Sequence, residues 1–264
     1  MRPRGAIALA LLLAAGPVYA NPDRGWRIAQ LGREIEAAPR DASLYLRRGQ
    51  LQREGGDFER AYADFERAAA LEPGLAGLDL AFAQLWLDAG RPERALAPLD
   101  RLLAGEPGHA EALVLRGRAR AALGDSRGAA ADLDAALRRL PEPTPELYLE
   151  RAAQQPPDAA LRGLDEGIAR LGPAYALVRA AIELEVEREH YAGALTRSDA
   201  LPEALRRQPE WQARRGDWLR ALGHEAEAQD AYRDARAALR APGAGRRSAA
   251  ETESLERRLA AALD

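Results

Sequence analysis

Glycine, alanine and proline recur along this chain at a constant spacing of about 34 residues. The aligned positions are Gly49, Ala83 and Gly117; Gly56, Gly90 and Gly124; Ala61, Ala95 and Ala129; and Pro73, Pro107 and Pro141. A single match would mean little in an alanine-rich sequence, but several columns share the period. Such a period indicates a repeat protein, in which each unit packs mainly on its neighbours and no single large core is needed.

The clearest unit, residues 42–75, predicts two helices joined by a tight turn. Asp41 is placed to accept amide hydrogen bonds at the start of a helix over residues 43–54. Gly56 ends that helix, because glycine enters left-handed backbone conformations without a Cβ clash. Asp57 then caps the second helix. Each period therefore encodes a helix–turn–helix.

The recurring residues resemble the signature of the tetratricopeptide repeat family. Tyr45, Gly49, Gly56, Asp57, Ala61, Phe65, Ala68 and Pro73 stand where that family places its characteristic residues. The resemblance covers about residues 42–242 and implies an all-α fold, a right-handed α-solenoid of helix–turn–helix repeats. In this arrangement the small Gly49 and Ala61 face each other across the hairpin, and Phe65 packs on the next unit.

The repeats divide the chain as follows. Residues 1–20 are expected to form a signal peptide, 21–41 an N-terminal capping helix, 42–143 three regular units, 144–208 two degenerate units, 209–242 a further unit, and 243–264 a hinge and a C-terminal capping helix. The fourth unit is short, so a kink or a change in superhelical curvature is expected near Pro156. The turn of the fifth unit at Glu189 lacks glycine. Ser248 and Glu251 form a capping box at the start of the last helix.

The N-terminus has the three parts of a secretory signal. Arg2 and Arg4 form a charged start, residues 6–15 an apolar run, and residues 18–20 a small-residue cleavage site. The apolar run is too short to span a bilayer, and no later run is long enough. No cysteine is available to carry a lipid. These features predict cleavage after Ala20 and a periplasmic or secreted bacterial protein.

Charge and composition exclude several classes of partner. The formal net charge is −3, and it becomes more negative when Arg2 and Arg4 are removed with the signal. A mildly acidic chain argues against nucleic-acid binding, which requires a basic face. The chain has no cysteine, so disulfides cannot stabilise it and an oxidising compartment would not harm it.

No motif in the sequence announces a reaction. His109, His190 and His224 fall in turns, and no pair of them has metal-ligand spacing. The chain has no glycine-rich phosphate loop, nucleophile elbow or HExxH helix. We therefore expect no enzyme activity, no cofactor and no metal.

Carboxylates are abundant and alternate with arginines at helical spacing. Arg60 with Asp64, and Asp64 with Arg67, illustrate the pattern. Spacings of three and four residues place opposite charges side by side on a helix. These residues are therefore expected to form a solvated, ion-pairing face.

Four tryptophans provide the other feature that could carry binding. Helical register places Trp86 in the core and Trp26, Trp211 and Trp218 near unit junctions, so packing is the expected role. An exposed Trp211 or Trp218 on the concave face would instead suggest sugar stacking. That outcome would favour an alternative function, a scaffold subunit for envelope polysaccharide assembly or export.

The family resemblance implies a partner-binding surface on the concave face, built by the first helix of each pair. On that face lie Leu46, Gln50 and Arg53 of the first unit, Leu80, Gln84 and Asp88 of the second, and Val114 and Arg118 of the third. Apolar and hydrogen-bonding groups mixed in this way suit an extended peptide or helix. One subclass of the family binds C-terminal carboxylates with Lys and Asn side chains. This chain has Leu46 and Gln50 at those positions, so the sequence does not support binding of a C-terminal carboxylate.

Overall fold

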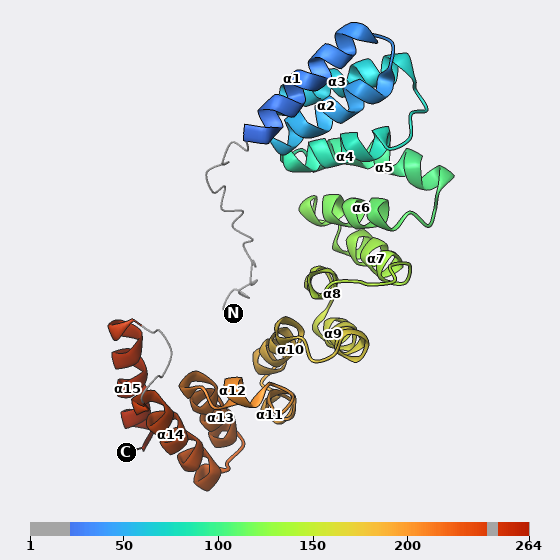
Figure 1. Ribbon diagram of the computed structural model, residues 1–264. Helices are drawn as coiled ribbons and strands as arrows, with labels where there is room; N and C mark the ends of the chain where they lie inside the picture. Colours follow the sequence, from blue (N-terminus) through green and yellow to red (C-terminus); the bar gives the residue numbers. More distant parts are fainter. Residues whose placement is uncertain (1–21, 242–247, 264) are drawn as a thin grey trace. The chain divides into compact units, whose positions relative to one another are not determined.

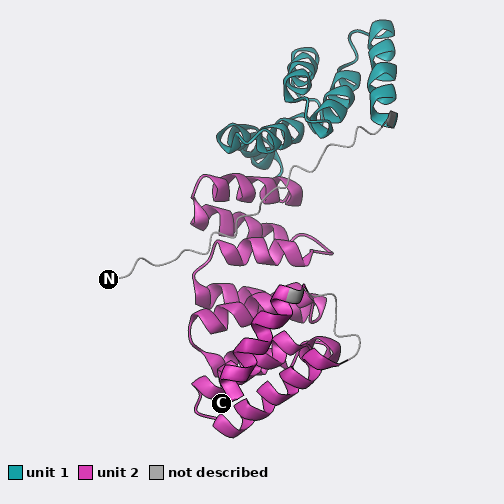
Figure 2. Ribbon diagram, turned by 90° about the vertical axis from the view of Figure 1, so that its left-hand side faces the viewer, with its two compact units in different colours: residues 1–107 teal, residues 108–264 magenta. Residues whose placement is uncertain are grey.

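A computed structural model of the chain describes residues 22–241 and 248–263, and all fifteen helices in that part are α-helices, with no strand among them (Figure 1). The predicted signal peptide and the predicted hinge at residues 243–247 lie outside the described residues. The chain divides into two compact units, one ending at Pro107 and the other beginning at Gly108 (Figure 2). The all-α fold predicted from the repeats is confirmed. None of the described helices is both long and apolar enough to cross a membrane.

The first compact unit contains a capping helix and two helix pairs. Its helices are α1 (Pro22–Ala37), α2 (Ala42–Glu54), α3 (Phe58–Leu71), α4 (Leu78–Asp88) and α5 (Pro92–Gly105). The pairs are α2 with α3 and α4 with α5. Leu31 and Ile35 of α1 form a buried cluster with Leu44 and Leu51 of α2.

The second compact unit contains four helix pairs and a closing helix. Its helices are α6 (Ala110–Ala122), α7 (Ser126–Leu137), α8 (Pro145–Ala153), α9 (Pro157–Leu171), α10 (Tyr175–Glu187), α11 (Tyr191–Ser198), α12 (Glu203–Arg206), α13 (Pro209–Ala221), α14 (Glu225–Arg240) and α15 (Ala249–Leu263). Helix α12 is a single turn inserted before the last pair. Helix α15 packs on α14 and buries Leu259.

Side-chain caps fix where the helices begin. The Asp41 carboxylate accepts a hydrogen bond from the Ser43 amide at 2.9 Å, and Asp57 accepts one from the Arg60 amide at 3.2 Å. At the start of α15, the Ser248 amide donates to Glu251 at 2.9 Å, and the Glu251 amide donates to the Ser248 hydroxyl at 3.2 Å. The predicted caps and capping box are confirmed.

In the pairs α2 with α3, α6 with α7 and α13 with α14, a glycine of the first helix meets a large side chain of the second. A Cβ on Gly49 would lie 2.5 Å from Cε1 of Phe65. A Cβ on Gly216 would lie 2.5 Å from Cε1 of Tyr232, and the contact of Gly117 with Leu133 is of the same kind. Because these glycines have no Cβ, the two helices of each of these pairs approach closely and fully bury the side chain between them, which is Phe65, Leu133 or Tyr232.

The two degenerate pairs reverse this contact. In the fourth pair, Gly167 of the second helix leaves room for Tyr148 of the first, and a Cβ on Gly167 would lie 2.8 Å from Cγ of Tyr148. In the fifth pair, Gly193 of α11 lies against Glu185 of α10 in the same way. These units therefore keep the close approach of the helices while losing the repeat signature.

The fourth pair also buries a charged residue. Helix α8 has only 9 residues, against 13 in α2, which confirms the predicted short helix. The Arg151 side chain is 3% exposed and lies 2.8 Å from Asp134 and 2.9 Å from Glu166. Arg151 also donates a hydrogen bond to the carbonyl of Gly163 at 2.8 Å. This arginine joins three helices, which the spacing of the repeats could not predict.

The predicted solvated ion pairs of Asp64 are wrong. The Asp64 side chain is 8% exposed and accepts hydrogen bonds from Nε and Nη2 of Arg48 at 2.7 and 2.6 Å. Arg60 instead lies 3.4 Å from Asp57. The partner of Asp64 is on the other helix of the pair, where spacing along one helix cannot reveal it. The third repeat contains the same interaction, between Arg116 and Asp132 at 2.9 and 2.8 Å.

The tryptophans follow the prediction in part. Trp211 and Trp218 are buried, as expected. Trp86 is only half-buried, with the Tyr62 ring 5.1 Å away and the Arg94 guanidinium 4.7 Å from its ring centre. The prediction is wrong for Trp26, which is 61% exposed on α1.

We expect Gly49→Ala to lower the free energy of unfolding by about 1–3 kcal/mol, because the new methyl group overpacks against Phe65. The loss should exceed the gain of about 1 kcal/mol that alanine brings to a helix interior. Chemical denaturation measures the change. Gly74→Ala is the control, since nothing lies within 4 Å of its Cβ position. Equal effects of the two substitutions would contradict the packing argument.

The turn of the fifth pair contains a strained residue. Glu189 has φ of 58°, the only positive φ of a non-glycine residue in the described chain, where other pairs place glycines such as Gly56 and Gly223. A side chain in this region costs about 1–2 kcal/mol, partly offset by its lower unfolded-state entropy. We expect Glu189→Gly to stabilise the protein by about 0.5–1 kcal/mol in thermal or chemical denaturation. Glu187→Gly, which removes the same side chain from α10, should destabilise it.

Candidate partner-binding face

The first helices of successive pairs lie next to each other within each compact unit. Helix α2 contacts both α1 and α4, and α8 contacts α10. We call the side of these first helices that carries the predicted binding residues the first-helix face.

In the first compact unit, the predicted residues differ in how accessible they are. Gln50, Leu80 and Gln84 are half-buried, and Asp88 is exposed. Leu46 is 8% exposed and packs in the core with Phe65, so it is not a residue of an open binding surface as predicted. Gln50, Leu80 and Gln84 supply two amide groups and one apolar side chain to this face.

Arg53 and Asp88 are brought together by the fold. The guanidinium of Arg53 on α2 binds the carboxylate of Asp88 on α4. The ion pair ties two neighbouring first helices, and a partner that used either charge would have to replace it. The sequence prediction assigned both residues to partner binding and missed this contact.

The second compact unit contains the same kind of link. Arg118 on α6 donates two hydrogen bonds to Glu150 on α8, both at 2.9 Å. These bonds raise the pKa of the Arg118 guanidinium above its ordinary value, although burial acts in the opposite direction. Val114 is half-buried and packs against the core beneath this pair. Arg118 is therefore held by its own chain in the described structure.

A third link joins α10 to α13. Arg214 donates to the two oxygens of Glu183 at 2.9 and 2.8 Å. The same guanidinium lies 4.6 Å from the ring centre of Trp211 and 5.1 Å from that of Trp218. The three links join residues 35, 32 and 31 positions apart. Opposite charges about one repeat apart are the sequence signal that could have predicted them.

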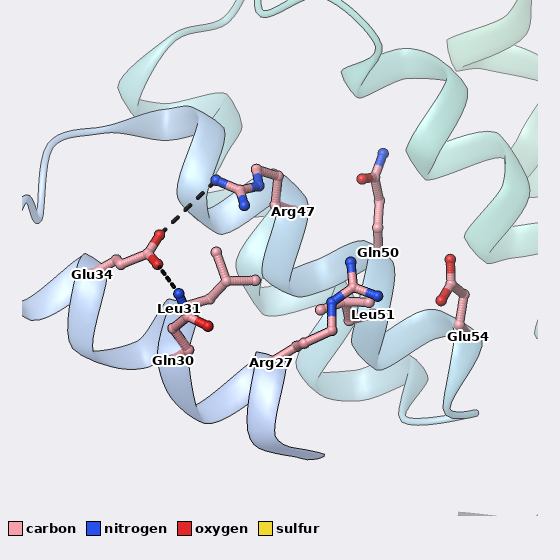
Figure 3. A pocket seen from close by; sticks show the side chains of 8 residues that line it. All are labelled: Arg27, Gln30, Leu31, Glu34, Arg47, Gln50, Leu51 and Glu54. Atoms are coloured by element: carbon pink, nitrogen blue, oxygen red, sulfur yellow. Dashed lines mark hydrogen bonds and ion pairs between the residues drawn. The ribbon is translucent and has the colours of Figure 1, made fainter. Parts of the chain in front are cut away.

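A pocket of about 260 Å³ opens between α1 and α2 (Figure 3). It is lined by Arg27, Gln30, Leu31 and Glu34 of α1 and by Arg47, Gln50, Leu51 and Glu54 of α2. Gln50 is the predicted binding residue that lines it. Sequence reasoning missed the α1 residues, because α1 lies outside the columns of the repeat.

Glu34 organises one side of this pocket. Its carboxylate accepts a hydrogen bond from Nε2 of Gln30 at 2.9 Å and lies 4.0 Å from a nitrogen of Arg47 (Figure 3). Leu31 and Leu51 are buried and give the pocket an apolar base. The pocket can therefore contact apolar and charged groups at once.

The described residues show no arrangement for metal chemistry. Across residues 22–241 and 248–263, no cluster of three or more His, Cys, Asp or Glu side chains could hold a metal ion. The three histidines lie at helix starts. The ring Nδ1 of His109 accepts the Ala112 amide at 3.2 Å, and Nδ1 of His190 lies 2.7 Å from Glu185.

Removing the buried Arg48–Asp64 ion pair and removing the more exposed Arg53–Asp88 ion pair should change the free energy of unfolding by different amounts. Asp64→Ala should lower the free energy of unfolding by about 3 kcal/mol, because it leaves the largely buried Arg48 without its carboxylate. Asp88→Ala should cost less than about 1 kcal/mol, since the Asp88 side chain is 45% exposed. Urea denaturation of both variants checks the difference. Equal losses would show that the Arg53–Asp88 pair contributes as much to the stability of the fold as the buried Arg48–Asp64 pair does.

Comparison with known proteins agrees with this architecture. Residues 52–114 match the tetratricopeptide repeat family, and no curated protein matches the chain. A tetratricopeptide repeat protein from Parabacteroides merdae is 19% identical, with a TM-score of 0.54 over 94% of this chain and 96% of that one. The structure of Naa15/Naa10 bound to HypK-THB contains a chain that is 15% identical, with a TM-score of 0.55 over 91% of this chain and 39% of that one.

At these identities, the likeness to solved structures shows the fold alone. The family match lies across the first and second repeats and the start of the third, where the glycine and alanine columns are most regular. The helix pairs continue beyond it through α14. Residues 52–114 therefore carry the tetratricopeptide repeat signature, and the described helix pairs have the fold of solved tetratricopeptide repeat proteins.

Proposed function

We propose that this protein is an exported, non-enzymatic scaffold that binds a peptide or a partner helix on its first-helix face, in the periplasm or cell envelope. The observation that carries the proposal is the composition of that face in the first compact unit. There, the half-buried Leu80 adds an apolar side chain to the half-buried amides of Gln50 and Gln84. This combination suits a peptide that presents both backbone and side chains.

The amide groups explain why a peptide backbone is the favoured ligand. A glutamine side chain has a donor and an acceptor, as a peptide group has, so it can hydrogen-bond to a backbone in either sense. Gln50 lies on α2 and Gln84 on α4. An extended peptide or a helix lying across these two helices would contact both.

The link between Arg53 and Asp88 supports binding indirectly. It joins α2 to α4 beside the two glutamines. A face whose helices are already tied together loses less conformational freedom when a partner binds. Arg53 and Asp88 therefore hold the binding groups in place and do not themselves contact the partner.

The proposed location rests on the sequence of residues 1–20. Their charged start, short apolar run and small-residue site are typical of a cleaved signal. The absence of cysteine in the chain suits an oxidising compartment.

The polysaccharide alternative gains no support from the tryptophans. It required Trp211 or Trp218 to be open to a sugar ring, and their exposed fractions are 7% and 3%. Protein binding is therefore the one function proposed.

The test is a variant in which Gln50, Leu80 and Gln84 are all changed to Ala. The partner is first recovered with residues 21–264 from a periplasmic extract, identified by mass spectrometry and purified. Each removed contact that matters costs about 1 kcal/mol or more, so calorimetry should show at least a tenfold loss of affinity. Circular dichroism should show an unchanged helical fold.

The control is Glu66→Ala with Glu93→Ala, two exposed residues on the second helices α3 and α5. This variant should bind the partner as the wild type does. Equal affinity of the wild type and the triple variant would contradict the proposed face. A loss in the control alone would move the site to the second helices.

A further inference from the structure

The pocket between α1 and α2 differs from the rest of the first-helix face in the state of its polar groups. Elsewhere, Arg53, Arg118 and Arg214 each bind a carboxylate of a neighbouring first helix. In the pocket, the side chains of Arg27, Gln50 and Glu54 have no hydrogen-bond or ion-pair partner among the described residues. This end of the face has unused hydrogen-bonding capacity.

Arg47 is also available to a ligand. Its contact with Glu34 is 4.0 Å long, and the two side chains are 61% and 38% exposed. An exposed pair with this geometry contributes little free energy. Glu34 keeps its hydrogen bond from Gln30 at 2.9 Å if Arg47 turns away. A ligand can therefore engage Arg47 without leaving Glu34 unpaired.

The two arginines reach the pocket from different helices. Arg27 projects from α1 and Arg47 from α2, and both line the pocket together with the buried Leu31 and Leu51 (Figure 3). Guanidinium groups form strong, charge-assisted hydrogen bonds with carboxylates. An apolar base flanked by two guanidinium groups matches a carboxylate carried on a short apolar stem.

The size of the pocket limits what it can hold. At about 260 Å³ it is smaller than the roughly 300–1,000 Å³ typical of small-molecule sites. It suits one side chain of a larger ligand. Glu34 and Glu54 also line it, so a run of several acidic residues would be repelled.

We propose that this pocket binds a single acidic side chain at an internal position of the partner peptide. The stem of the glutamate or aspartate packs on Leu31 and Leu51, and its carboxylate binds Arg27 and Arg47. The Gln50 amide hydrogen-bonds to an adjacent peptide group. This inference rests on the proposed function and names the chemistry of the partner. It needs no free C-terminus, in contrast to the carboxylate grip that Leu46 and Gln50 do not support.

The first step of the test uses random linear peptides displayed on phage. The peptides are joined to the coat protein through their C-terminal ends, so none has a free C-terminal carboxylate. Panning on residues 21–264 should enrich sequences that share one acidic position. An enriched peptide is then made with an amidated C-terminus, alongside a version in which the acid is replaced by its amide.

The second step compares the two peptides on protein variants by calorimetry. Replacing the acid by the amide should weaken binding to the wild type at least tenfold, as expected for a charge-assisted hydrogen bond. In Arg27→Gln with Arg47→Gln, the two peptides should bind almost equally, because the carboxylate has lost its partners. Both arginines are exposed, and circular dichroism checks that the variant folds.

The matched control is Arg33→Gln with Arg60→Gln. These exposed arginines lie on α1 and α3 outside the pocket, and their removal changes the net charge by the same amount. The control should retain the full difference between the peptides. A loss of the difference in the control would show a general charge effect and overturn the proposed site.

Two other results would overturn the inference while leaving the scaffold function intact. One is that the enriched peptides share no acidic position, or that replacing the acid by its amide weakens binding to the Arg27/Arg47 variant as much as it weakens binding to the wild type. The other is no enrichment although the protein still captures a partner from the periplasmic extract. If the protein captures no partner and enriches no peptide, the inference and the proposed function fail together.

Discussion

The close approach of the two helices in each pair is the contact on which the rest of the structure depends. In five of the six pairs it places a glycine of one helix against a large side chain of the other, as Gly49 and Phe65 show in the first repeat; in the second pair Ala83 takes the glycine position. With the helices this close, Arg48 and Asp64 bind across the same pair with their charges largely out of water. The outer side of the first helix then remains for contacts with its neighbours or a partner.

The degenerate repeats keep the contact between a glycine and a large side chain, but the two residues exchange helices. In the fourth and fifth pairs, the glycines are Gly167 and Gly193 of the second helix, and the large side chains are Tyr148 and Glu185 of the first. The Glu185 carboxylate is buried, which by itself would raise its pKa. Hydrogen bonds from Arg197 and His190 outweigh this effect, so the pKa of Glu185 lies below its ordinary value. A carboxylate can fill the space because these partners hydrogen-bond to it.

Most of the helical architecture could be predicted from the sequence, because its causes are local. Caps such as Asp41 and turn glycines such as Gly56 act within a few residues, and the 34-residue period repeats them. What could not be predicted involves side chains that meet across helices. The Arg48–Asp64 pair, the Arg118–Glu150 link and the pocket beside α1 all join residues from two helices. Leu46 and Trp26 differ from expectation because a helical register alone does not decide which side a neighbour covers.

The proposed function places the partner on the first helices of the first compact unit. Hydrogen–deuterium exchange of the protein, alone and saturated with its captured partner, tests this claim directly. We expect slower exchange in α2 and α4, over residues 46–54 and 80–88, with little change in α3 and α5. Slower exchange confined to the second helices α3 and α5 would contradict it.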